Sequence, residues 1–321
     1  MTKEAVDPTL KKLFQRVTRA FFIATPDNLL IPLGRIAASK DEWSQLASSA
    51  VAGLKGVVLA ASLPFQLTCD AVQKQRFYSF LAAERIRGLK EVASGQTLSG
   101  EQEQRAYVRA QEKMKEFMES KAGSSEIQKN ILNDLSDHMD YSPVNTGAYE
   151  LLVQCLISTW GVFETFAASF IISWLNANPR AAKSVVASSE LKEYFGRPVL
   201  EIDVIDAHGF DLTRSMGSAL FRGKKLDNLT VVKAILGLLF SDAELQKALG
   251  KLWLLNQQRH LFVHRRGVAD EKYLKNTKTN IALGQRLIIE SDDLEKHIMD
   301  VHDAIVCAIE TANNFPNLHS S

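Results

Sequence analysis

The stretch RHLFVHRRGVADEKYL, residues 259–274, places an arginine and two histidines within six positions, and two further arginines follow at once. Histidine titrates near neutral pH and can exchange a proton, and arginine can hold an anionic group through two parallel hydrogen bonds. Arg259 and His264 are therefore candidates for half of a catalytic site. The alternative is an ordinary helix end, where His264, Arg265 and Arg266 are cations favoured by the helix dipole.

The residues upstream predict the helix that carries this motif. Ser241 and Glu244 have the spacing of a capping box, and we expect one helix from there to about Arg266, with Gly267 as its stop. At about 100° per residue, Arg259 and His264 lie about 140° apart on a straight helix. A shared site therefore requires a distorted last turn or a groove completed by a second copy of the chain.

The apolar stripe of this predicted helix continues into polar residues. It begins with Leu245, Leu249 and Leu252, and its next members are Asn256, Arg259, His260 and Val263. A solvent-facing helix end explains such a stripe, and so does a groove or a symmetric interface that needs polar groups.

A metal site is the alternative use of the two histidines. His260 and His264 are four residues apart and share a helix face, as zinc ligands often do. The glutamate of the HExxH metalloprotease pattern is absent, and no third ligand follows at a typical spacing. The acidic run NDLSDHMD (133–140) lacks the alternating oxygen ligands and the glycine of a calcium loop. We therefore predict no metal site, and no cofactor is expected.

A long apolar helix is predicted from Ala148 to about Asn176, with apolar side chains on most of its faces. Glu164 is the only acidic or basic residue between Glu150 and Arg180. Because a buried carboxylate needs a partner, we expect Glu164 first as a buried helix residue with one partner. The alternatives are that it pairs with Arg259 as a structural contact or orients Arg259 for function.

The remaining elements predict an all-α fold in two domains. The segment YSPVNTG (141–147) is the best domain boundary, which gives an N-terminal helical domain of unknown role (1–140) and a C-terminal domain (146–316). Asp7-Pro8 resembles the start of a basic amphipathic helix, which we expect to pack on its own domain. Asp292 and Glu295 predict the cap of a final helix, and the sequence QRLIIE allows at most one short strand.

The composition is that of a soluble globular protein. Of 321 residues, 46% are apolar and 23% are charged, and the formal charge of +1 provides no global attraction to nucleic acid or anionic lipid. Three separated cysteines, Cys69, Cys155 and Cys307, are typical of reduced side chains in a cytosolic protein. No signal peptide is recognisable, so we expect a cytoplasmic location.

Two apolar stretches require a comparison with membrane spans. Val51–Thr68 contains Lys55, and Val153–Leu175 contains Glu164 near its middle. A central carboxylate costs a lipid-exposed helix roughly 2–3 kcal/mol or more. Buried bundle helices explain both stretches better, and we predict no stable membrane insertion.

The motif resembles the signature of the HEPN superfamily (higher eukaryotes and prokaryotes nucleotide-binding domain). That signature is Arg, then a polar residue that is usually Asn, Asp or His, then three residues and His, at the end of a core helix; Arg259, His260 and His264 match it. The continuation Gly-x-x-Asp-x-x-Tyr-Leu (267–274) and the order of the predicted helices extend the likeness over roughly 148–315. It implies a four-helix up-and-down bundle in the C-terminal domain.

The resemblance also implies an activity. Many HEPN proteins are metal-independent endoribonucleases, often toxins or effectors of phage defence, in which two domains pair to form one cleft. It implies that Arg259 holds the scissile phosphate, that His264 acts as base or acid, and that His260 positions the motif or the RNA. Asn256 and Glu164 would support the site, while Arg265 and Arg266 would attract RNA. The expected partners are RNA, a second copy of the chain, and a regulatory protein or antitoxin.

One departure from the family concerns its regulation. HEPN toxins that are controlled by AMP transfer carry a tyrosine two residues after the histidine, where this chain has Arg266. Two other hypotheses remain open: a non-catalytic HEPN module that binds nucleotide or assembles a larger complex, and a membrane-active effector that uses residues 46–68.

Overall fold

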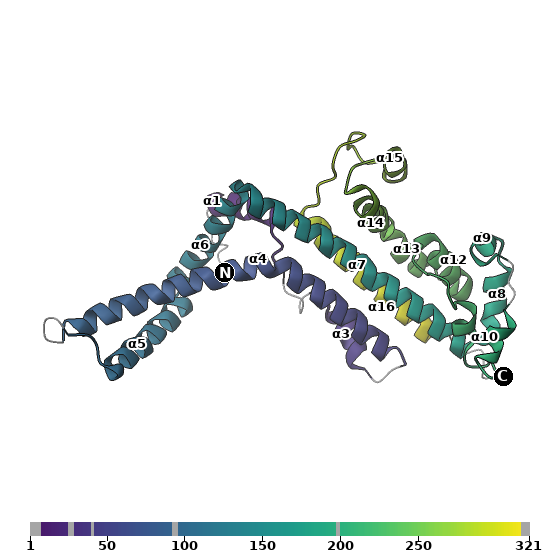
Figure 1. The fold of residues 1–321 in the computed structure, drawn as a ribbon, viewed down its shortest axis with the longest axis horizontal. Helices are drawn as coiled ribbons and strands as arrows, with labels where there is room; N and C mark the ends of the chain where they lie inside the picture. Colours follow the sequence, from purple (N-terminus) through teal and green to yellow (C-terminus); the bar gives the residue numbers. More distant parts are fainter. Residues whose placement is uncertain (1–7, 25–28, 40–41, 92–95, 197–199, 316–321) are drawn as a thin grey trace, which may run out of the picture. The chain divides into compact units, whose positions relative to one another are not determined.

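The computed structural model describes residues 8–24, 29–39, 42–91, 96–196 and 200–315. Within these ranges the chain forms helices and turns without any strand, and Val268 and Arg286 make an isolated antiparallel bridge (Figure 1). The prediction of an all-α fold is therefore confirmed. Asp7, the predicted cap of the first helix, lies outside the described residues, and that helix begins at Pro8.

The longer helices are α1 (Pro8–Ala20), α3 (Ile31–Ala38), α4 (Ser44–Leu89), α5 (Gly100–Glu119), α6 (Lys121–Asp140), α7 (Ser142–Ala177), α12 (Leu229–Phe240), α13 (Ala243–Lys251), α14 (Trp253–Arg265) and α16 (Ser291–Asn314). The shorter ones are η1 (Pro179–Ala181), α8 (Ala182–Ala187), η2 (Ser189–Leu191), α9 (Lys192–Phe195), α10 (Ile202–Asp206), α11 (Met216–Leu220) and α15 (Glu271–Thr277).

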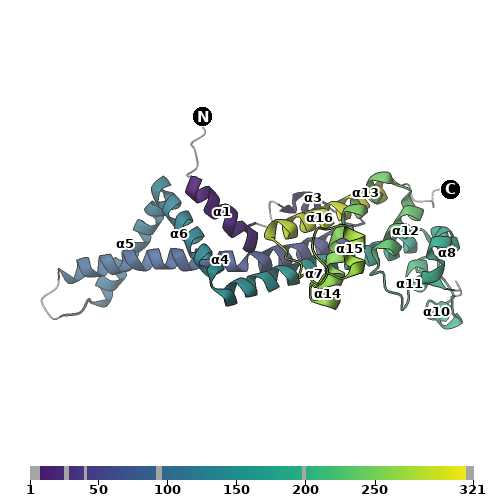
Figure 2. The same ribbon diagram turned by 90° about the horizontal axis from the view of Figure 1, so that it is seen from above.

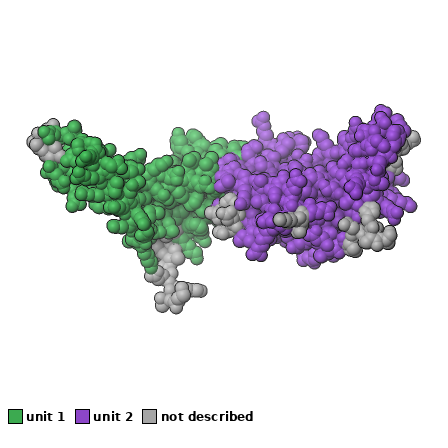
Figure 3. All heavy atoms as spheres, turned by 90° about the horizontal axis from the view of Figure 1, so that it is seen from below, with its two compact units in different colours: residues 1–23, 61–150 green, residues 24–60, 151–321 purple. Residues whose placement is uncertain are grey.

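The chain forms two compact units, coloured separately in Figure 3. Unit 1 consists of residues 1–23 and 61–150, and unit 2 of residues 24–60 and 151–321. This division differs from the one expected at residues 141–147, because the first part of α4 belongs to unit 2 although it is far from the motif in sequence. Both α4 and α7 contribute residues to each unit.

The segment YSPVNTG, predicted as the domain boundary, is helical from Ser142 onward. α7 begins at Ser142, and the backbone N–H groups of Val144 and Asn145 both bond to the carbonyl oxygen of Tyr141. Pro143 falls in the first turn, where a missing N–H costs nothing because that group has no partner within the helix. The proline and asparagine that indicate a boundary therefore belong to a helix start.

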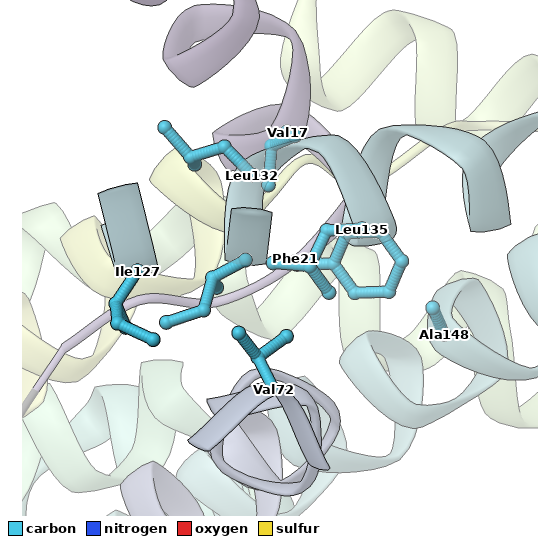
Figure 4. Packing of buried hydrophobic residues seen from close by; sticks show 8 residues of the cluster. Val17, Phe21, Val72, Ile127, Leu132, Leu135 and Ala148 are labelled. Atoms are coloured by element: carbon cyan, nitrogen blue, oxygen red, sulfur yellow. The ribbon is translucent and has the colours of Figure 1, made fainter. Parts of the chain in front are cut away.

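Unit 1 has its core where α1, α4 and α6 meet. Val17 and Phe21 at the end of α1 contact Val72 of α4 and Leu132 and Leu135 of α6 (Figure 4). These side chains are buried, so the amphipathic first helix packs on its own unit, as the sequence predicts. α5 adds a smaller apolar cluster against α4.

An ion pair with a buried carboxylate and an exposed lysine also joins α4 to α5 in unit 1. The carboxylate of Glu84 accepts a hydrogen bond from Lys113 and lies 4.0 Å from the guanidinium of Arg109. The Glu84 side chain is only 2% exposed, so this contact satisfies a charge that would otherwise be buried alone. The bond from Lys113 lowers the pKa of Glu84 below its ordinary value.

In unit 2 the long helix α7 provides the aromatic centre of the core. Phe170 of α7 lies 4.8 Å from Trp43 between ring centroids, and Trp174, one turn later, lies 4.7 Å from Phe240 of α12. The predicted apolar helix is thus present, and it begins six residues earlier than Ala148. α16 lies alongside α7 in both ribbon views (Figures 1 and 2).

The final helix, α16, begins two residues earlier than predicted. Its cap is Glu290, whose side chain forms a reciprocal capping box with Asp293, and not the predicted pair Asp292 and Glu295. Further along α16, His302 accepts a hydrogen bond at Nε2 from the backbone N–H of Leu33 in α3. The up-and-down arrangement expected for a HEPN bundle stays a prediction.

Among the residues that the structure describes, two helices are long and apolar enough to cross a membrane, Ser44–Leu89 and Pro143–Ala177. Their most apolar 18-residue windows are 39% and 50% buried within the protein. The core helix of a soluble protein can be equally long and apolar, so the absence of stable membrane insertion and the cytoplasmic location stay predictions.

Candidate functional site

The motif lies on a separate short helix, which follows an interruption of the helix at Leu252. α13 ends at Lys251, Leu252 makes a tight turn with its N–H bonded to the carbonyl of Leu249, and α14 begins at Trp253. The predicted single helix is therefore two helices. Its predicted cap is also wrong, because Ser241 has φ of 48° and ends α12, while Asp242 accepts the N–H of Leu245 and begins α13.

The turn at Leu252 changes which face of the helix is buried. The buried residues of α14 are Leu255, Asn256, Gln258, Leu261 and Phe262. Beyond Asn256 the stripe that continues from the leucines of α13 is not buried: Arg259 and His260 face a cavity and Val263 is 46% exposed, which agrees with the groove and the solvent-facing helix end that the sequence leaves open. The physical reason is that a three-residue bonded turn rotates the chain further per residue than an α-helix does, so the stripe does not continue in phase.

Two left-handed residues end α14 directly after the motif. Arg266 has φ of 52° and Gly267 has φ of 80°, and their N–H groups bond to the carbonyls of Phe262 and Leu261. A Cβ atom at Gly267 would lie 2.6 Å from Cε1 of Phe262, so the position requires glycine for its space as well as its conformation. Gly267 is thus the helix stop that the sequence predicts.

The spacing Gly-x-x-Asp-x-x-Tyr (267–273) builds the segment after the motif. Asp270 caps α15 by accepting the N–H of Tyr273 at 2.8 Å, and its Oδ2 lies 3.6 Å from Nε of Arg265. Tyr273 is buried against Leu261 of α14 and against Ala269. The positions Gly267, Asp270 and Tyr273 therefore fold α15 onto α14, whatever chemistry the motif performs.

Five of the seven predicted site residues line one cavity of about 520 Å³, which we call the α14 cavity. They are Asn256, Arg259, His260, His264 and Arg265. The cavity is also lined by Asp227, Asn228, Thr230, Trp253, Gln257, Leu261, Asp270, Lys272, Tyr273 and Asn276. α14 is helical from Trp253 to Arg265, and both Arg259 and His264 line this cavity within a single chain.

Arg259 and His264 have few competing contacts in the α14 cavity. Within the described part of the chain, the guanidinium of Arg259 forms no ion pair or hydrogen bond, although its side chain is half-buried. His264 is exposed, and its ring stacks on that of His260, with centroids 5.5 Å apart and planes inclined by 28°. The guanidinium is free to bind an anion, and the imidazole is open to solvent.

The surroundings of His260 favour its neutral form. Burial lowers its pKa from the ordinary value, and the nearby charges of Arg259, His264 and Lys272 lower it further. Asp227 acts in the opposite direction but contributes least. At neutral pH His260 therefore adds an uncharged ring beside His264, without a second positive charge.

Glu164 and Arg266 lie outside the α14 cavity. The carboxylate of half-buried Glu164 accepts a hydrogen bond from the indole N–H of Trp160 at 3.0 Å, and within the described residues it makes no contact with Arg259. Trp160, one turn earlier on α7, is the single partner expected for this carboxylate, and the alternative pairing with Arg259 is not found among the described residues. Arg266 is exposed and serves as the left-handed end of α14.

A buried polar contact between Gln258 and His297, which no sequence motif indicates, holds α14 against α16. Gln258 accepts a hydrogen bond from Nε2 of His297 at 2.7 Å, which ties α14 to α16. Both side chains are buried, and burial lowers the pKa of His297 to about 4, so the imidazole stays neutral. The only sequence signal is the presence of polar residues at positions where each helix faces the core.

The histidine pair has no further metal-ligating neighbour. Among the described residues, no group of three or more His, Cys, Asp or Glu side chains is arranged to hold a metal ion. The three cysteines form no disulfide, and the thiol of Cys155 is buried, which raises its pKa to about 11.

The α14 cavity is therefore the candidate site, with a free guanidinium, an open imidazole and a neutral second histidine. Comparison of the chain with protein-family models, with curated proteins and with solved structures finds no match.

Proposed function

We propose that this protein is a metal-independent endoribonuclease of the HEPN type, with the α14 cavity as its site. The observation that supports the proposal most directly is that one cavity is lined by both Arg259, whose guanidinium has no ion-pair partner among the described residues, and His264, whose ring is exposed. A guanidinium that faces a cavity without a counter-ion is available to bind an anionic group through two parallel hydrogen bonds.

The proposed reaction uses the nucleophile that RNA carries. The 2′-oxygen attacks the adjacent phosphorus while the bond to the 5′-oxygen of the next nucleotide breaks, which leaves a 2′,3′-cyclic phosphate and a 5′-hydroxyl. One proton leaves the 2′-hydroxyl and one reaches the leaving 5′-oxygen. His264 carries out one of these transfers, since imidazole titrates near neutral pH. Arg259 stabilises the charge on the phosphoryl oxygens through paired N–H donors.

The neighbouring residues have supporting roles in this proposal. His260 holds the ring of His264 by stacking. Arg265 faces the same cavity and is held by Asp270 at 3.6 Å, so it provides positive charge for the RNA backbone. Arg266, which lies outside the cavity, has no role in the reaction.

The proposed enzyme acts as a homodimer, since the HEPN resemblance implies that two motifs share one cleft. A regulatory protein or antitoxin is the further partner that this resemblance implies, with a role as a toxin or an antiviral effector in the cytoplasm. Sedimentation equilibrium of the purified chain tests the dimer, and a monomer at concentrations where cleavage occurs would contradict the shared cleft.

The deciding experiment is RNA cleavage in excess chelator by the wild type, Arg259→Ala and His264→Ala. We expect chelator-resistant cleavage that is reduced at least about a hundredfold in both variants, in line with the loss of a general acid–base group. Arg266→Asn is the matched control, because it removes an arginine of the same segment outside the cavity and asparagine accepts a left-handed backbone. Cleavage that survives in both site variants contradicts the proposal, and RNA binding without cleavage favours the non-catalytic nucleotide-binding module.

A further inference from the structure

The α14 cavity extends well beyond the charged residues of the motif. Its uncharged part is formed by the start of α14 and the end of α15, with the side chains of Trp253, Asn256, Gln257 and Asn276. Asn228 and Thr230, at the start of α12, line the same cavity. None of these groups is required by the proposed proton transfers, so this part of the cavity needs a separate explanation.

Asn256 is a buried amide with an unsatisfied oxygen. The residue is 6% exposed, it lines the α14 cavity, and its Oδ1 atom has no hydrogen-bond partner. Buried polar side-chain atoms in folded proteins are nearly always paired, so an unpaired one beside a cavity indicates a group that a ligand supplies. The amide group carries both a donor and an acceptor. Rotation by half a turn exchanges the oxygen and the nitrogen without changing the shape of the side chain, so either of them can face a ligand.

Trp253 supplies an aromatic surface at the same part of the cavity. Its ring is 39% exposed, and the indole N–H donates to the backbone carbonyl of Asn276 at 3.2 Å. The side chain of Asn276 in turn donates to Oε1 of Gln257 at 2.8 Å, which links the end of α15 back to α14. The indole is therefore held in place with its polar group already used, and a ring in this state offers its face for stacking.

We propose that the uncharged part of the α14 cavity is a nucleobase subsite for single-stranded RNA. One unpaired base stacks on Trp253, and the Asn256 amide pairs with its edge, while the phosphate chain continues to Arg259. Arg259 lies six positions after Trp253, which is about 9 Å along the helix, so the base belongs to a nucleotide close to the cleaved bond. This inference rests on the proposed function, because it takes RNA to be the ligand of the cavity.

The amide of Asn256 also selects the base. An asparagine side chain matches adenine best, accepting a hydrogen bond from the exocyclic amino group while donating to the neighbouring ring nitrogen. The subsite therefore prefers adenine, and Asn256→Asp, which only accepts hydrogen bonds when ionised, loses that preference.

Tryptophan fluorescence provides a selective measurement. Trp43, Trp160 and Trp174 are buried, so acrylamide quenches mainly Trp253. The probes are single-stranded hexamers of 2′-O-methyl adenylate and of 2′-O-methyl cytidylate, which the enzyme cannot cleave because the 2′-hydroxyl is blocked. We expect the adenylate hexamer to protect Trp253 from acrylamide at about tenfold lower concentration than the cytidylate hexamer. This ratio corresponds to the discrimination given by one good pair of hydrogen bonds.

The variants separate the base subsite from the proposed catalytic groups. Asn256→Asp and Asn256→Ala should reduce the tenfold ratio to about one, and circular dichroism checks that both variants fold. Trp253→Phe keeps an aromatic face and should keep the preference for the adenylate hexamer, whereas Trp253→Ala should lose it. Because both variants lack the reporting tryptophan, their binding is measured by fluorescence polarisation of a labelled hexamer. Val263→Ala, on the exposed side of α14 and away from the cavity, is the control and should change nothing.

The outcomes distinguish this inference from the proposed function. Base-selective protection that persists in Arg259→Ala supports the subsite even if no cleavage is found. RNA cleavage without any protection of Trp253, or without a base preference that depends on Asn256, overturns the subsite and leaves the nuclease proposal intact. Protection by free AMP as strong as that by the hexamer overturns the assignment to an RNA chain.

Discussion

Substitution of Gly267 by alanine should destabilise unit 2 for two reasons that can be measured separately. The backbone at Gly267 has φ of 80°, and a left-handed conformation costs an L-residue roughly 1–2 kcal/mol. In addition, the new Cβ would lie 2.6 Å from Cε1 and 3.0 Å from Cδ1 of Phe262, and such overpacking costs typically about 1–3 kcal/mol. The sum is a loss of about 2–5 kcal/mol in the free energy of unfolding.

Gly284 is a matched control for this substitution. Its φ of 78° is nearly the same, but a Cβ there would have no atom within 4 Å. Gly284→Ala should therefore cost only the conformational part, about 1–2 kcal/mol. The loss of unfolded-state freedom that alanine brings is common to both variants and cancels in their difference.

Urea denaturation followed by tryptophan fluorescence is the suitable assay, because all four tryptophans belong to unit 2. We expect the unfolding free energy of Gly267→Ala to fall below that of Gly284→Ala by at least about 1 kcal/mol. The reasoning is refuted if the two variants are equally stable, since the contact with Phe262 would then carry no energy.

Three further changes test other contacts. His297, whose pKa burial lowers from 6.5 to about 4, remains neutral while its unfolded counterpart binds a proton. The contribution of His297 to the free energy of unfolding should therefore be complete above about pH 6.5 and fall by roughly 1.4 kcal/mol per pH unit down to about pH 4. Urea denaturation at a series of pH values measures this slope, and His297→Gln should flatten it. An unchanged slope in that variant would contradict the prediction. Glu84, with a lowered pKa, stabilises unit 1 above its ordinary pKa of 4.5 and loses that effect as the pH falls through the folded value. Lys113→Ala should lower the free energy of unfolding of unit 1 by roughly 1–3 kcal/mol at neutral pH, because it leaves the buried carboxylate without its hydrogen bond. The loss should appear as faster amide hydrogen exchange in α4 and α5, and unchanged exchange would refute the prediction. Asp270→Ala removes the cap of α15 and should cost about 1 kcal/mol, whereas Arg265→Ala, which loses only an exposed ion pair, should cost less than half as much in the same urea assay.

The sequence predicts those helices whose signals are local and strong. The apolar run of α7, the stripe of α16 and the glycine stop after Arg265 follow from periodicity and from the conformation that glycine allows. The turn at Leu252 cannot be predicted in this way, because leucine is a good helix former and no glycine or proline follows the end of α13. Pro143 misleads in the other direction, since proline occurs both in linkers and in the first turn of a helix.

For the site, the sequence predicts what α14 itself carries. Asn256, Arg259, His260 and His264 lie within three turns of one helix, so a single local motif indicates them together. Asp227 reaches the cavity from a distant part of the chain, and no local pattern indicates that approach. No pairing of Glu164 with Arg259 is found among the described residues, because the partner of this carboxylate is a neighbour on the same helix, the indole N–H of Trp160 at 3.0 Å.

The chemical nature of the cut ends tests the central claim most directly. A labelled RNA is incubated with the protein in excess chelator, and its products are compared with those of the same RNA carrying a single 2′-deoxyribose at the preferred cleavage position. Arg259 and His264 acting on the 2′-oxygen predict 2′,3′-cyclic phosphate and 5′-hydroxyl ends, and no cut at the deoxy position. Products with 5′-phosphate ends, or an undiminished cut at the deoxy position, would contradict the account.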